Sequence, residues 1–423
     1  MGIITDLLRS PNINGEPDAL VAITAHTTNL KRFSTWHPDA QGSGCNFNME
    51  IAKESAIGEA IERYSGRYPN KDIFEASFTD VKNLNVNFLN PYDLLAINDS
   101  QIINNPDLEI FDEDKVIKWK EGKDLLTNEL FLLPDEVVSL HRELGVKNNF
   151  IPRMGGIASG RTFEQAITSG LLELLERDAT ARWWVLGEPC VELKGSISDI
   201  VPLEGMTDSI QIRIFKLDTF TQSASTICAV LIDKELDIPF AGFACRTTLK
   251  EAIPKAIGEC FQLRRIAVAL LDPDSWAWGD KSTGRIAAFP LVPYRKDRKY
   301  GDDLKNPQDM TQLIHNLQLA LDKRSHNAFF AHLDSSIGQS IDIRNIPDNT
   351  KNFKLFGNTE LSDLGPIVWT NFTTSDVSLM GYKVVRVTAP NLLINNPEAW
   401  IPWRDIYRLY KYPQINVPPM PHA

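Results

Sequence analysis

The sequence is poor in the features that mark secreted, membrane or zinc-finger proteins. Its 423 residues include only five cysteines, scattered and never in a Cys-x-x-Cys pair, which argues against a disulfide scaffold or a structural zinc site. The N-terminal MGIITDLLRSPNING lacks a basic start followed by an apolar run, so no signal peptide is expected. No stretch reaches the roughly 18 apolar residues of a membrane span. We therefore expect a cytoplasmic protein in a reducing compartment.

Excess positive charge is missing too. The formal net charge is −11 at pH 7, whereas nucleic-acid binding needs clustered Lys and Arg, so nucleic acid is not an expected partner. The composition is otherwise ordinary for a globular protein, with 43% hydrophobic and 23% charged residues. The length allows two or three domains, but no low-complexity linker divides the chain, so one large catalytic domain is expected.

One pattern recurs three times in distant parts of the chain. The segments AKESAIGEAIER, AITSGLLELLER and AIPKAIGECFQL, which start at residues 52, 166 and 252, each predict an amphipathic helix. The seventh residue after each start is Glu59, Glu173 or Glu259, and the tenth is Glu62, Glu176 or Gln262. Side chains three positions apart leave a helix from one face, so each pair is expected to act together. The shared register predicts that the three helices build one site.

The chemistry of this site follows from its carboxylates. In the middle copy, leucines at 171, 172, 174 and 175 confine the two glutamates to a narrow wedge, where they are poorly hydrated and need cations or hydrogen-bond donors. Oxygen ligands favour magnesium or calcium, and magnesium commonly combines one or two carboxylates with substrate phosphates. The sequence therefore predicts a nucleotide site with magnesium. The candidate metal ligands are Glu59, Glu62, Glu173, Glu176 and Glu259.

An arginine follows each acidic pair. Arg63, Arg177 and Arg264 lie one or two residues beyond the second acidic or amide position. Their guanidinium groups suit either salt bridges with neighbouring glutamates or phosphate oxygens, and the sequence leaves both roles open. A single pair of glutamates on a helix usually lies on a solvent-exposed face. A binding site is favoured here because the pair recurs at the same positions in three segments.

The intervals between the acidic segments predict a mixed α/β or α+β fold with sheets covered by helices. Runs of β-branched and aromatic residues predict strands at 226–232, 240–246, 328–333, 367–373 and 382–388. Residues 1–40 are expected to form a short helix, a turn at 11–15 and an extended lead-in, and 295–306 and 345–352 to form exposed loops. Glycines at 42–44 and 155–160 predict loops, which are either ordinary turns or loops that present backbone amides to a ligand.

The chain ends in the proline-rich segment VPPMPHA. Prolines favour an extended, polyproline-like conformation with few backbone donors. Such a tail is either frayed or delivers its terminal carboxylate into a cleft, and composition alone leaves both possibilities open.

From about residue 30 to the C-terminus these motifs resemble the YcaO family of ATP-using peptide-backbone modifiers. Ser55-x-x-x-Glu59-x-x-Glu62-Arg63, Glu173-x-x-Glu176-Arg177-Asp178 and Glu259-x-x-Gln262-x-Arg264 are similar to that family's three nucleotide motifs. The resemblance implies a YcaO-like fold in which three repeated acidic helices converge on an ATP and Mg2+ site. It also implies an N-terminal extension at 1–30, a catalytic domain at 31–411 and a tail at 412–423. Ser43 replaces a lysine frequent in the family, and Gly155 an asparagine.

The tail is similar to the Pro-x-Pro-x-Pro end of azoline-forming members, although Val417 stands where the first proline would fall. The resemblance implies ATP-dependent cyclodehydration of Cys, Ser or Thr in a ribosomally synthesised precursor peptide, with the Ala423 carboxylate or His422 as the base. It further implies a separate E1-like partner that binds the leader peptide, a possible flavin dehydrogenase, and a homodimer or hetero-oligomer. The alternatives are thioamide or amidine formation, or a scaffold that has lost turnover.

Overall fold

The computed structural model describes residues 2–28, 41–68, 73–141, 145–151, 153, 155–279, 290–346, 353–355 and 359–422. Within these ranges the strands form three sheets. The first sheet consists of β1 (Ile4–Ser10), β2 (Val21–Thr27) and β3 (Gln41–Asn46), all antiparallel. The second has the order β12 (Ile238–Arg246), β11 (Ser225–Asp233), β10 (Ile210–Leu217), β9 (Cys190–Lys194) and β13 (Ile337–Asp342).

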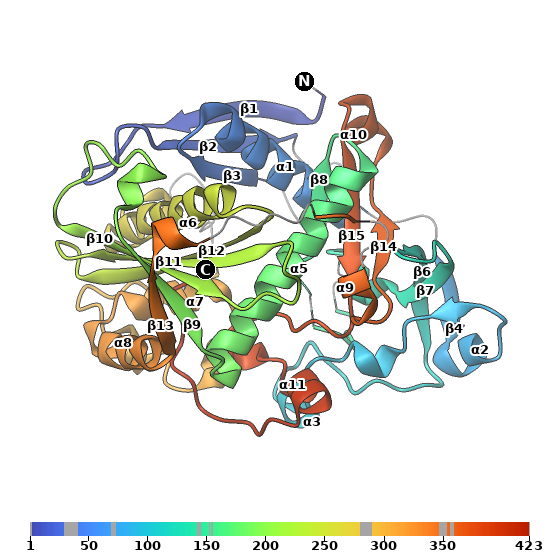
Figure 1. The fold of residues 1–423 in the computed structure, drawn as a ribbon. Coiled ribbons are helices and arrows are strands. Elements are labelled where there is room, and N and C mark those ends of the chain that lie inside the picture. The colour runs from blue at the N-terminus through green and yellow to red at the C-terminus, as the bar shows by residue number, and fades with distance from the viewer. Residues whose placement is uncertain are drawn as a thin grey trace.

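The third sheet lies on the other side of the molecule (Figure 1). Its order is β5 (Asn87–Phe88), β7 (Leu130–Pro134), β6 (Val116–Asp124), β14 (Val368–Asn371), β15 (Lys383–Thr388) and β8 (Ile157–Gly160), with β4 (Phe74–Ser77) also paired to β6. The mixed α/β fold with sheets covered by helices, predicted from the sequence, is thereby confirmed.

Three long helices carry the repeated acidic segments: α1 (Met49–Arg67), α5 (Phe163–Leu186) and α6 (Leu249–Leu271). Helix α1 packs on β2 and β3, α5 on β8 and β15, and α6 on β11 and β12, so each acidic helix covers the strand that precedes it in the chain. Figure 1 shows α5 crossing the middle of the molecule between the second and third sheets. The shorter helices are α2 (Phe78–Lys82), α3 (Asp99–Ile103), α4 (Asp135–Val138), α7 (Leu313–Ala320), α8 (His326–Ser335), α9 (Thr359–Ser362), α10 (Ser375–Leu379) and α11 (Trp403–Tyr410).

Local sequence explains where the acidic helices begin. The side chains of Asn48, Thr162 and Thr248 each accept a backbone N–H from the first turn of α1, α5 and α6, which satisfies donors that have no partner within the helix. The three helices therefore start at the same distance from their glutamates, and the acidic positions lie in corresponding turns.

Two glycines let α1 approach β3 closely. A Cβ atom at Gly44 would lie 1.9 Å from the Ala52 carbonyl oxygen, and one at Gly42 would lie 2.2 Å from that of Ala56. The prediction of a glycine loop here is wrong, because 42–44 is part of β3 and the missing side chains serve strand–helix packing. At the second site the prediction holds in part: Gly156 has a φ of +89°, and Gly160 ends β8.

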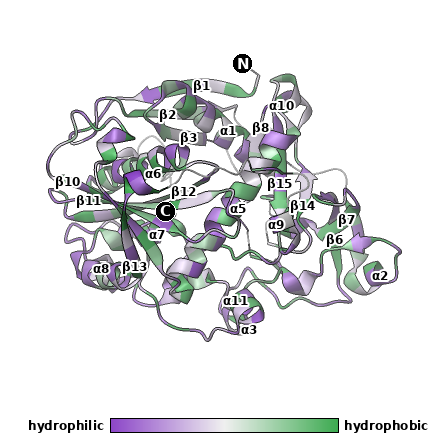
Figure 2. Ribbon diagram, viewed as in Figure 1, coloured by the Kyte–Doolittle hydropathy of each residue, from purple (hydrophilic) through white to green (hydrophobic). Residues whose placement is uncertain are grey.

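Hydrophobic residues follow the central strands, as Figure 2 shows in green. Most of β11 and β12 is buried on both faces, since α6 covers one face and the aromatic cluster around Trp183 and Phe243 covers the other. All five cysteines are unpaired and buried. No described helix is long and apolar enough to cross a membrane.

The predicted strands at 226–232, 240–246, 367–373 and 382–388 correspond to β11, β12, β14 and β15. The strand predicted at 328–333 is wrong, because this segment lies in helix α8, which buries His326, Phe329 and Leu333 at helical spacing. The short helix predicted near the N-terminus is also wrong. Residues 4–10 form β1 because they pair with β2, and this pairing outweighs local helix propensity.

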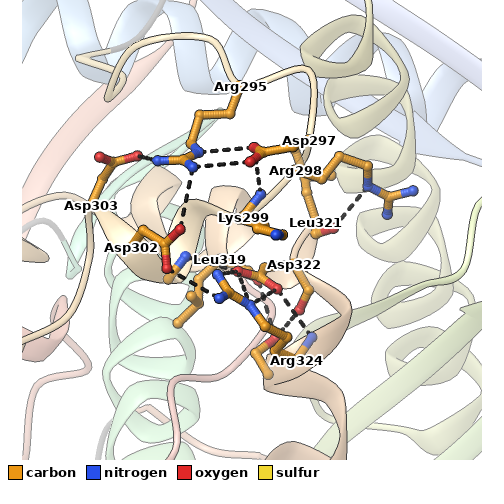
Figure 3. A network of polar contacts seen from close by, with 12 residues as sticks. Arg295, Asp297, Arg298, Lys299, Asp302, Asp303, Leu319, Leu321, Asp322 and Arg324 are labelled. Atoms are coloured by element: carbon orange, nitrogen blue, oxygen red, sulfur yellow. Dashed lines mark hydrogen bonds and ion pairs between the residues drawn. The ribbon is translucent and has the colours of Figure 1, made fainter.

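The segment 295–306 is mostly exposed, as expected of a loop, but it contains the 3-10 turn Tyr300–Asp302 and is fixed by ion pairs. Arg295 contacts Asp297, Asp302 and Asp303, and Arg324 links Asp302 to Asp322 (Figure 3). Tyr300 in this segment is buried. Most of the loop predicted at 345–352, and the lead-in at 29–40, lie outside the described residues.

Candidate active site

The structure brings the acidic segments into one large cavity of 3490 Å³. We call Glu59, Glu62, Glu173, Glu176 and Glu259 the acidic cluster and this space the main cavity. All five cluster residues line it, and so do the predicted nucleotide or base residues Ser55, Arg63, Arg177, Gln262 and His422. Three helices that are far apart in sequence thus present their glutamates to the same space.

The first glutamate of each pair accepts a backbone N–H from the strand on which its own helix packs. Glu59 accepts from Ser43 at 2.6 Å, and Glu259 accepts from Phe243 at 3.1 Å. Glu173 accepts from Gly156 at 2.9 Å, just before β8. The amides that the glycine segments were expected to offer to a ligand are therefore already bonded to carboxylates.

The second position of each pair contacts the strand of the next repeat. Glu62 of α1 accepts from Ser159 of β8 at 2.7 Å, and Glu176 of α5 accepts from Cys245 of β12 at 3.0 Å. Gln262 of α6 completes the set by donating to Ser43 Oγ of β3 at 2.5 Å. The three strand–helix repeats are consequently joined in a closed ring, with one side-chain link at each of the three boundaries.

Burial makes the central carboxylates reluctant to ionise. Burial, followed by repulsion from Glu173 and Glu59, raises the pKa of Glu62 to about 7, although hydrogen bonds from Ser159 oppose the shift. Burial raises the pKa of Glu176 to about 7 as well, with Arg177 opposing the shift and two other cluster carboxylates adding to it. Such a site gains stability from a bound cation.

Two basic side chains that the sequence analysis missed also line the main cavity. Lys255 forms a 2.8 Å ion pair with Glu259 and, against the effect of burial, keeps the pKa of that carboxyl below its usual value. Arg246 lies at the end of β12 and also lines the cavity. A sequence signal for Lys255 existed: Ser55, which stands four residues before Glu59, corresponds to Lys255 four residues before Glu259.

Arg264 is the predicted nucleotide residue that the structure places elsewhere. Its side chain is buried against Asp233 at 2.7 Å and also donates to the Asn14 carbonyl oxygen, so it does not line the main cavity. The next residue, Arg265, does line the cavity, but it is paired with Glu16. The sequence analysis placed Arg264 in the site by analogy with Arg63 and Arg177. Arg264, however, lies two residues after Gln262, not one, and each additional residue turns the side chain by about 100° around the helix.

The proline-rich tail is docked and not frayed. The Ala241 N–H donates to the Pro421 carbonyl oxygen at 2.9 Å, and the Trp184 indole donates to Pro418 at 2.7 Å. In Figure 1 the C-terminal segment returns from α11 to the centre of the molecule beside β12. The last described residue, His422, is buried at the edge of the main cavity, and the candidate base Ala423 lies outside the described residues.

His422 connects the tail to the acidic cluster. Its Nδ1 lies 3.0 Å from the Ala241 carbonyl oxygen, and its Nε2 lies 3.3 Å from the Arg177 guanidinium. Burial and the positive charge of Arg177 lower the pKa of His422 to about 4. The imidazole is therefore neutral at pH 7 and accepts a hydrogen bond from Arg177, which itself contacts two glutamates of the cluster.

The geometry can be tested against a bound magnesium ion. In the described parts of the chain, no three His, Cys, Asp or Glu side chains converge closely enough to hold a metal ion alone. Magnesium, however, usually takes one or two carboxylates and completes its shell with water and substrate phosphates. Buried carboxylates with raised pKa values, facing a cavity that also contains basic side chains, fit a cation that is bound together with a polyphosphate.

A family model described as YcaO cyclodehydratase, ATP- and Mg2+-binding, matches residues 43–344, which is more than half of the chain. The chain belongs to the YcaO family. This confirms the resemblance drawn from the acidic motifs, and members of this family bind ATP and Mg2+. The matched range contains all three acidic helices of this YcaO chain.

Solved structures share the fold at low sequence identity. YcaO from Methanopyrus kandleri bound with AMPPCP and Mg2+ has a TM-score of 0.59 at 16% identity, covering 92% of this chain and 86% of that one. The E. coli microcin synthetase McbBCD complex gives 0.60 at 14% identity, with coverages of 92% and 88%. A heterocyclase in complex with substrate and cofactor gives 0.67 at 18% identity, covering 99% of this chain and 55% of the heterocyclase chain. These likenesses establish the fold.

A sequence relative comes from Methanothermobacter thermautotrophicus. That uncharacterised protein is 26% identical to this YcaO chain over 246 residues, a match that covers 53% of this chain and 60% of the relative.

Proposed function

We propose that this YcaO protein is an ATP-dependent cyclodehydratase that converts Cys, Ser or Thr residues of a ribosomally synthesised precursor peptide into azolines. The observation that supports this most directly is the meeting of the acidic cluster and the docked proline-rich tail in one cavity. Azoline formation requires that an amide oxygen, a poor leaving group, be converted into phosphate, a good one. A site that holds a triphosphate beside a peptide serves this purpose.

In the proposed reaction, the thiol or hydroxyl of the peptide loses its proton to solvent and attacks the carbonyl carbon of the preceding amide. The resulting oxyanion attacks the γ-phosphorus of ATP and ADP leaves; the amide nitrogen then loses its proton as phosphate departs, forming the C=N bond. Magnesium supplies charge neutralisation at the transferring phosphoryl group. The acidic cluster would hold the metal, and Ser55, Arg63, Arg177 and Gln262 would position the nucleotide.

We assign the removal of the amide proton to the Ala423 carboxylate in preference to His422. Both nitrogens of His422 already have partners, and a pKa of about 4 makes this imidazole a weak base at pH 7. In this proposal His422 positions Arg177 and anchors the tail beside the main cavity. Residues 412–423 would then form a functional tail, 31–411 the catalytic domain and 1–30 an extension.

Partners are proposed on the same basis. The microcin synthetase neighbours are complexes, one of them with pro-MccB17 bound, and the heterocyclase neighbour is in complex with substrate. We propose that this chain likewise acts on a precursor peptide together with a separate E1-like, leader-binding protein. A flavin dehydrogenase would be needed only if azolines are oxidised to azoles. A homodimer or a hetero-oligomer is the proposed assembly.

The test is to combine the purified chain with MgATP and with the precursor peptide and E1-like protein encoded by neighbouring genes. Mass spectrometry should show loss of one water per modified residue, with ADP and phosphate formed. Glu62→Gln and Glu176→Gln should each lower the rate by about 100-fold or more, because charge stabilisation at the phosphoryl group is lost. Exposed Glu50→Gln, on the same helix as Glu62, is the matched control.

Three results would contradict the proposal. Exchange of oxygen for sulfur would establish thioamide formation instead, and incorporation of an amine would establish amidine formation. Complete absence of ATP hydrolysis with peptide and partner present would support a scaffold without turnover.

A further inference from the structure

A second, much smaller pocket lies behind the docked tail. Its volume is about 20 Å³, enough for one water-sized group. Seven residues line both this small pocket and the main cavity, so the two spaces adjoin. They include Glu398, in the 3-10 turn Glu398–Trp400, and His422 of the tail. The small pocket therefore borders the main cavity where the tail is docked.

Glu398 is the charged residue of this small pocket and has no partner there. Only 9% of its surface is exposed, and among the described residues neither a hydrogen bond nor an ion pair reaches its carboxyl group. A buried carboxyl without a donor is unfavourable, because water is removed and nothing replaces it. Surface glutamates of the same chain find basic neighbours readily, as Glu54 does with Arg161. Glu398 thus resembles a ligand-binding group more than a structural one.

A second residue with an unsatisfied acceptor lines the same space. Asn316 of α7 lines the small pocket, and its buried Oδ1 has no hydrogen-bond partner. The small pocket is thus lined by one carboxyl group and by an amide whose carbonyl oxygen accepts no hydrogen bond from the described residues. A complementary group brings both hydrogen-bond donors and positive charge in a volume close to that of a water molecule. A primary ammonium group brings both, whereas a water molecule brings donors without charge.

The walls of the small pocket suit a carbon chain behind that group. They are mainly apolar and come from α5, from residues around Ile401 and from Val417 and Met420 of the tail. The small pocket has room for the charged head of a lysine side chain, and its methylene stem would lie against Ile401 and Val417, which line both spaces. An N-terminal α-amine has no such stem, so it fits this shape poorly.

We propose that Glu398 and Asn316 form a binding pocket for a primary alkylammonium group, namely a lysine side chain of the peptide that enters the main cavity. The pocket would fix the register of the peptide relative to the tail. The identification of the ligand as a peptide rests on the proposed function, whereas the ammonium chemistry rests on the pocket alone.

The proposal carries a specific pH dependence. Among the described residues that line the small pocket, Glu398 and His422 are the titratable ones, and His422 is neutral near pH 7. Burial raises the pKa of Glu398 to about 8. An ammonium ion binds the ionised carboxylate, so affinity should rise by up to about tenfold per pH unit below pH 8 and then level off until the amine itself deprotonates.

The test uses the full chain without ATP, and Nα-acetyl-lysine N-methylamide as the probe. By NMR titration this probe should bind about tenfold more tightly than the norleucine analogue, which has the stem but no amine. Binding should lower the pKa of Glu398, followed through the ¹³C signal of its carboxyl group. The preference for lysine should vanish in Glu398→Gln, weaken in Asn316→Leu, and persist in exposed Glu235→Gln.

Equal binding of the lysine and norleucine probes to the wild-type chain would overturn the proposal, and so would an unchanged preference in Glu398→Gln. Alaninamide, which offers only an α-amine, should bind weakly; binding as tight as that of the lysine probe would overturn the assignment to a side chain. This experiment measures binding and not turnover, so equal binding of the two probes would not contradict the cyclodehydratase proposal. Likewise, absence of heterocycle formation would not contradict the ammonium-binding pocket.

Discussion

Gln262 donates a hydrogen bond to Ser43 across 219 residues of sequence, and Ser43 in turn donates its backbone N–H to Glu59. This contact joins the last strand–helix repeat to the first. Where the other two repeats use a glutamate that accepts from a strand, the third uses an amide that donates to a hydroxyl. Gln262 therefore closes the ring without adding another negative charge to the acidic cluster.

A double-mutant cycle tests this closure. Ser43→Ala and Gln262→Ala each remove the contact, so each should lower the free energy of unfolding by about 1 kcal/mol, and the double variant should lose less than the sum. Urea denaturation measures all four proteins. Strict additivity would show that the two side chains do not interact in solution.

Lys255 should control nucleotide binding through Glu259. Lys255→Met removes the ammonium that keeps this buried carboxyl ionised, so the pKa of Glu259 should rise. Affinity for MgATP, measured by isothermal titration calorimetry, should fall about tenfold. The control is Lys250→Met, an exposed lysine on the same helix. Equal affinity of the two variants for MgATP would show that Lys255 does not contribute to nucleotide binding.

Gly44 should tolerate no side chain. In Gly44→Ala the new methyl would have to displace helix α1, whose Ala52 oxygen lies 1.9 Å from the methyl position. We expect destabilisation of about 3 kcal/mol by urea denaturation, a value at the upper end for overpacking. Ser43→Ala, one residue earlier, is the comparison and should be milder. A Gly44→Ala protein as stable as wild type would mean that α1 and β3 are less closely packed than the structure has them.

Acid should release the tail through His422. In the folded protein the pKa of His422 is about 4, below the ordinary value of 6.5, so on acidification the unfolded chain takes up a proton before the folded protein does. The free energy of unfolding is therefore at its full value above pH 6.5 and decreases as the pH falls toward 4. Over this range the free energy of unfolding should fall by about 3 kcal/mol in total. Hydrogen exchange at Ala241, whose N–H is bonded to Pro421, should accelerate from pH 7 to pH 5 after correction for intrinsic rates.

Two variants separate His422 from other histidines near the tail. His422→Gln cannot be protonated, so its exchange at Ala241 should no longer depend on pH in this window. His332, which contacts the Trp184 carbonyl oxygen, provides the control: His332→Gln should retain the wild-type dependence. If His332→Gln abolished the dependence instead, the titration would belong to that residue.

Much of the fold was predictable because its pattern is local and strong. The three acidic helices, four of five predicted strands and the family itself were predicted from periodicity and motif and are confirmed. The strand predicted at 328–333 was wrong because a short apolar run does not distinguish a strand from a helix. The helix predicted near the N-terminus was wrong because residues 4–10 become a strand only through pairing with β2.

The candidate site was predictable to the level of residue type and register. The position of Lys255 could have been found from its correspondence with Ser55, but its ion pair with Glu259 in the cavity could not. Arg264 was placed in the site by its position in a motif. Glu398 and Asn316 carried no sequence signal, because what distinguishes them is that no described residue pairs with the Glu398 carboxyl group or donates to Asn316 Oδ1.

By itself, the sequence determined that three helices carry carboxylates in one register, because helical periodicity links spacing to direction. Tertiary structure decided which strand each carboxylate meets, that Arg264 is bonded to Asp233, and that His422 lies against Arg177. These outcomes depend on contacts between residues up to several hundred positions apart. Burial and hydrogen bonding across such distances are set by the packing of whole elements, which no local pattern encodes.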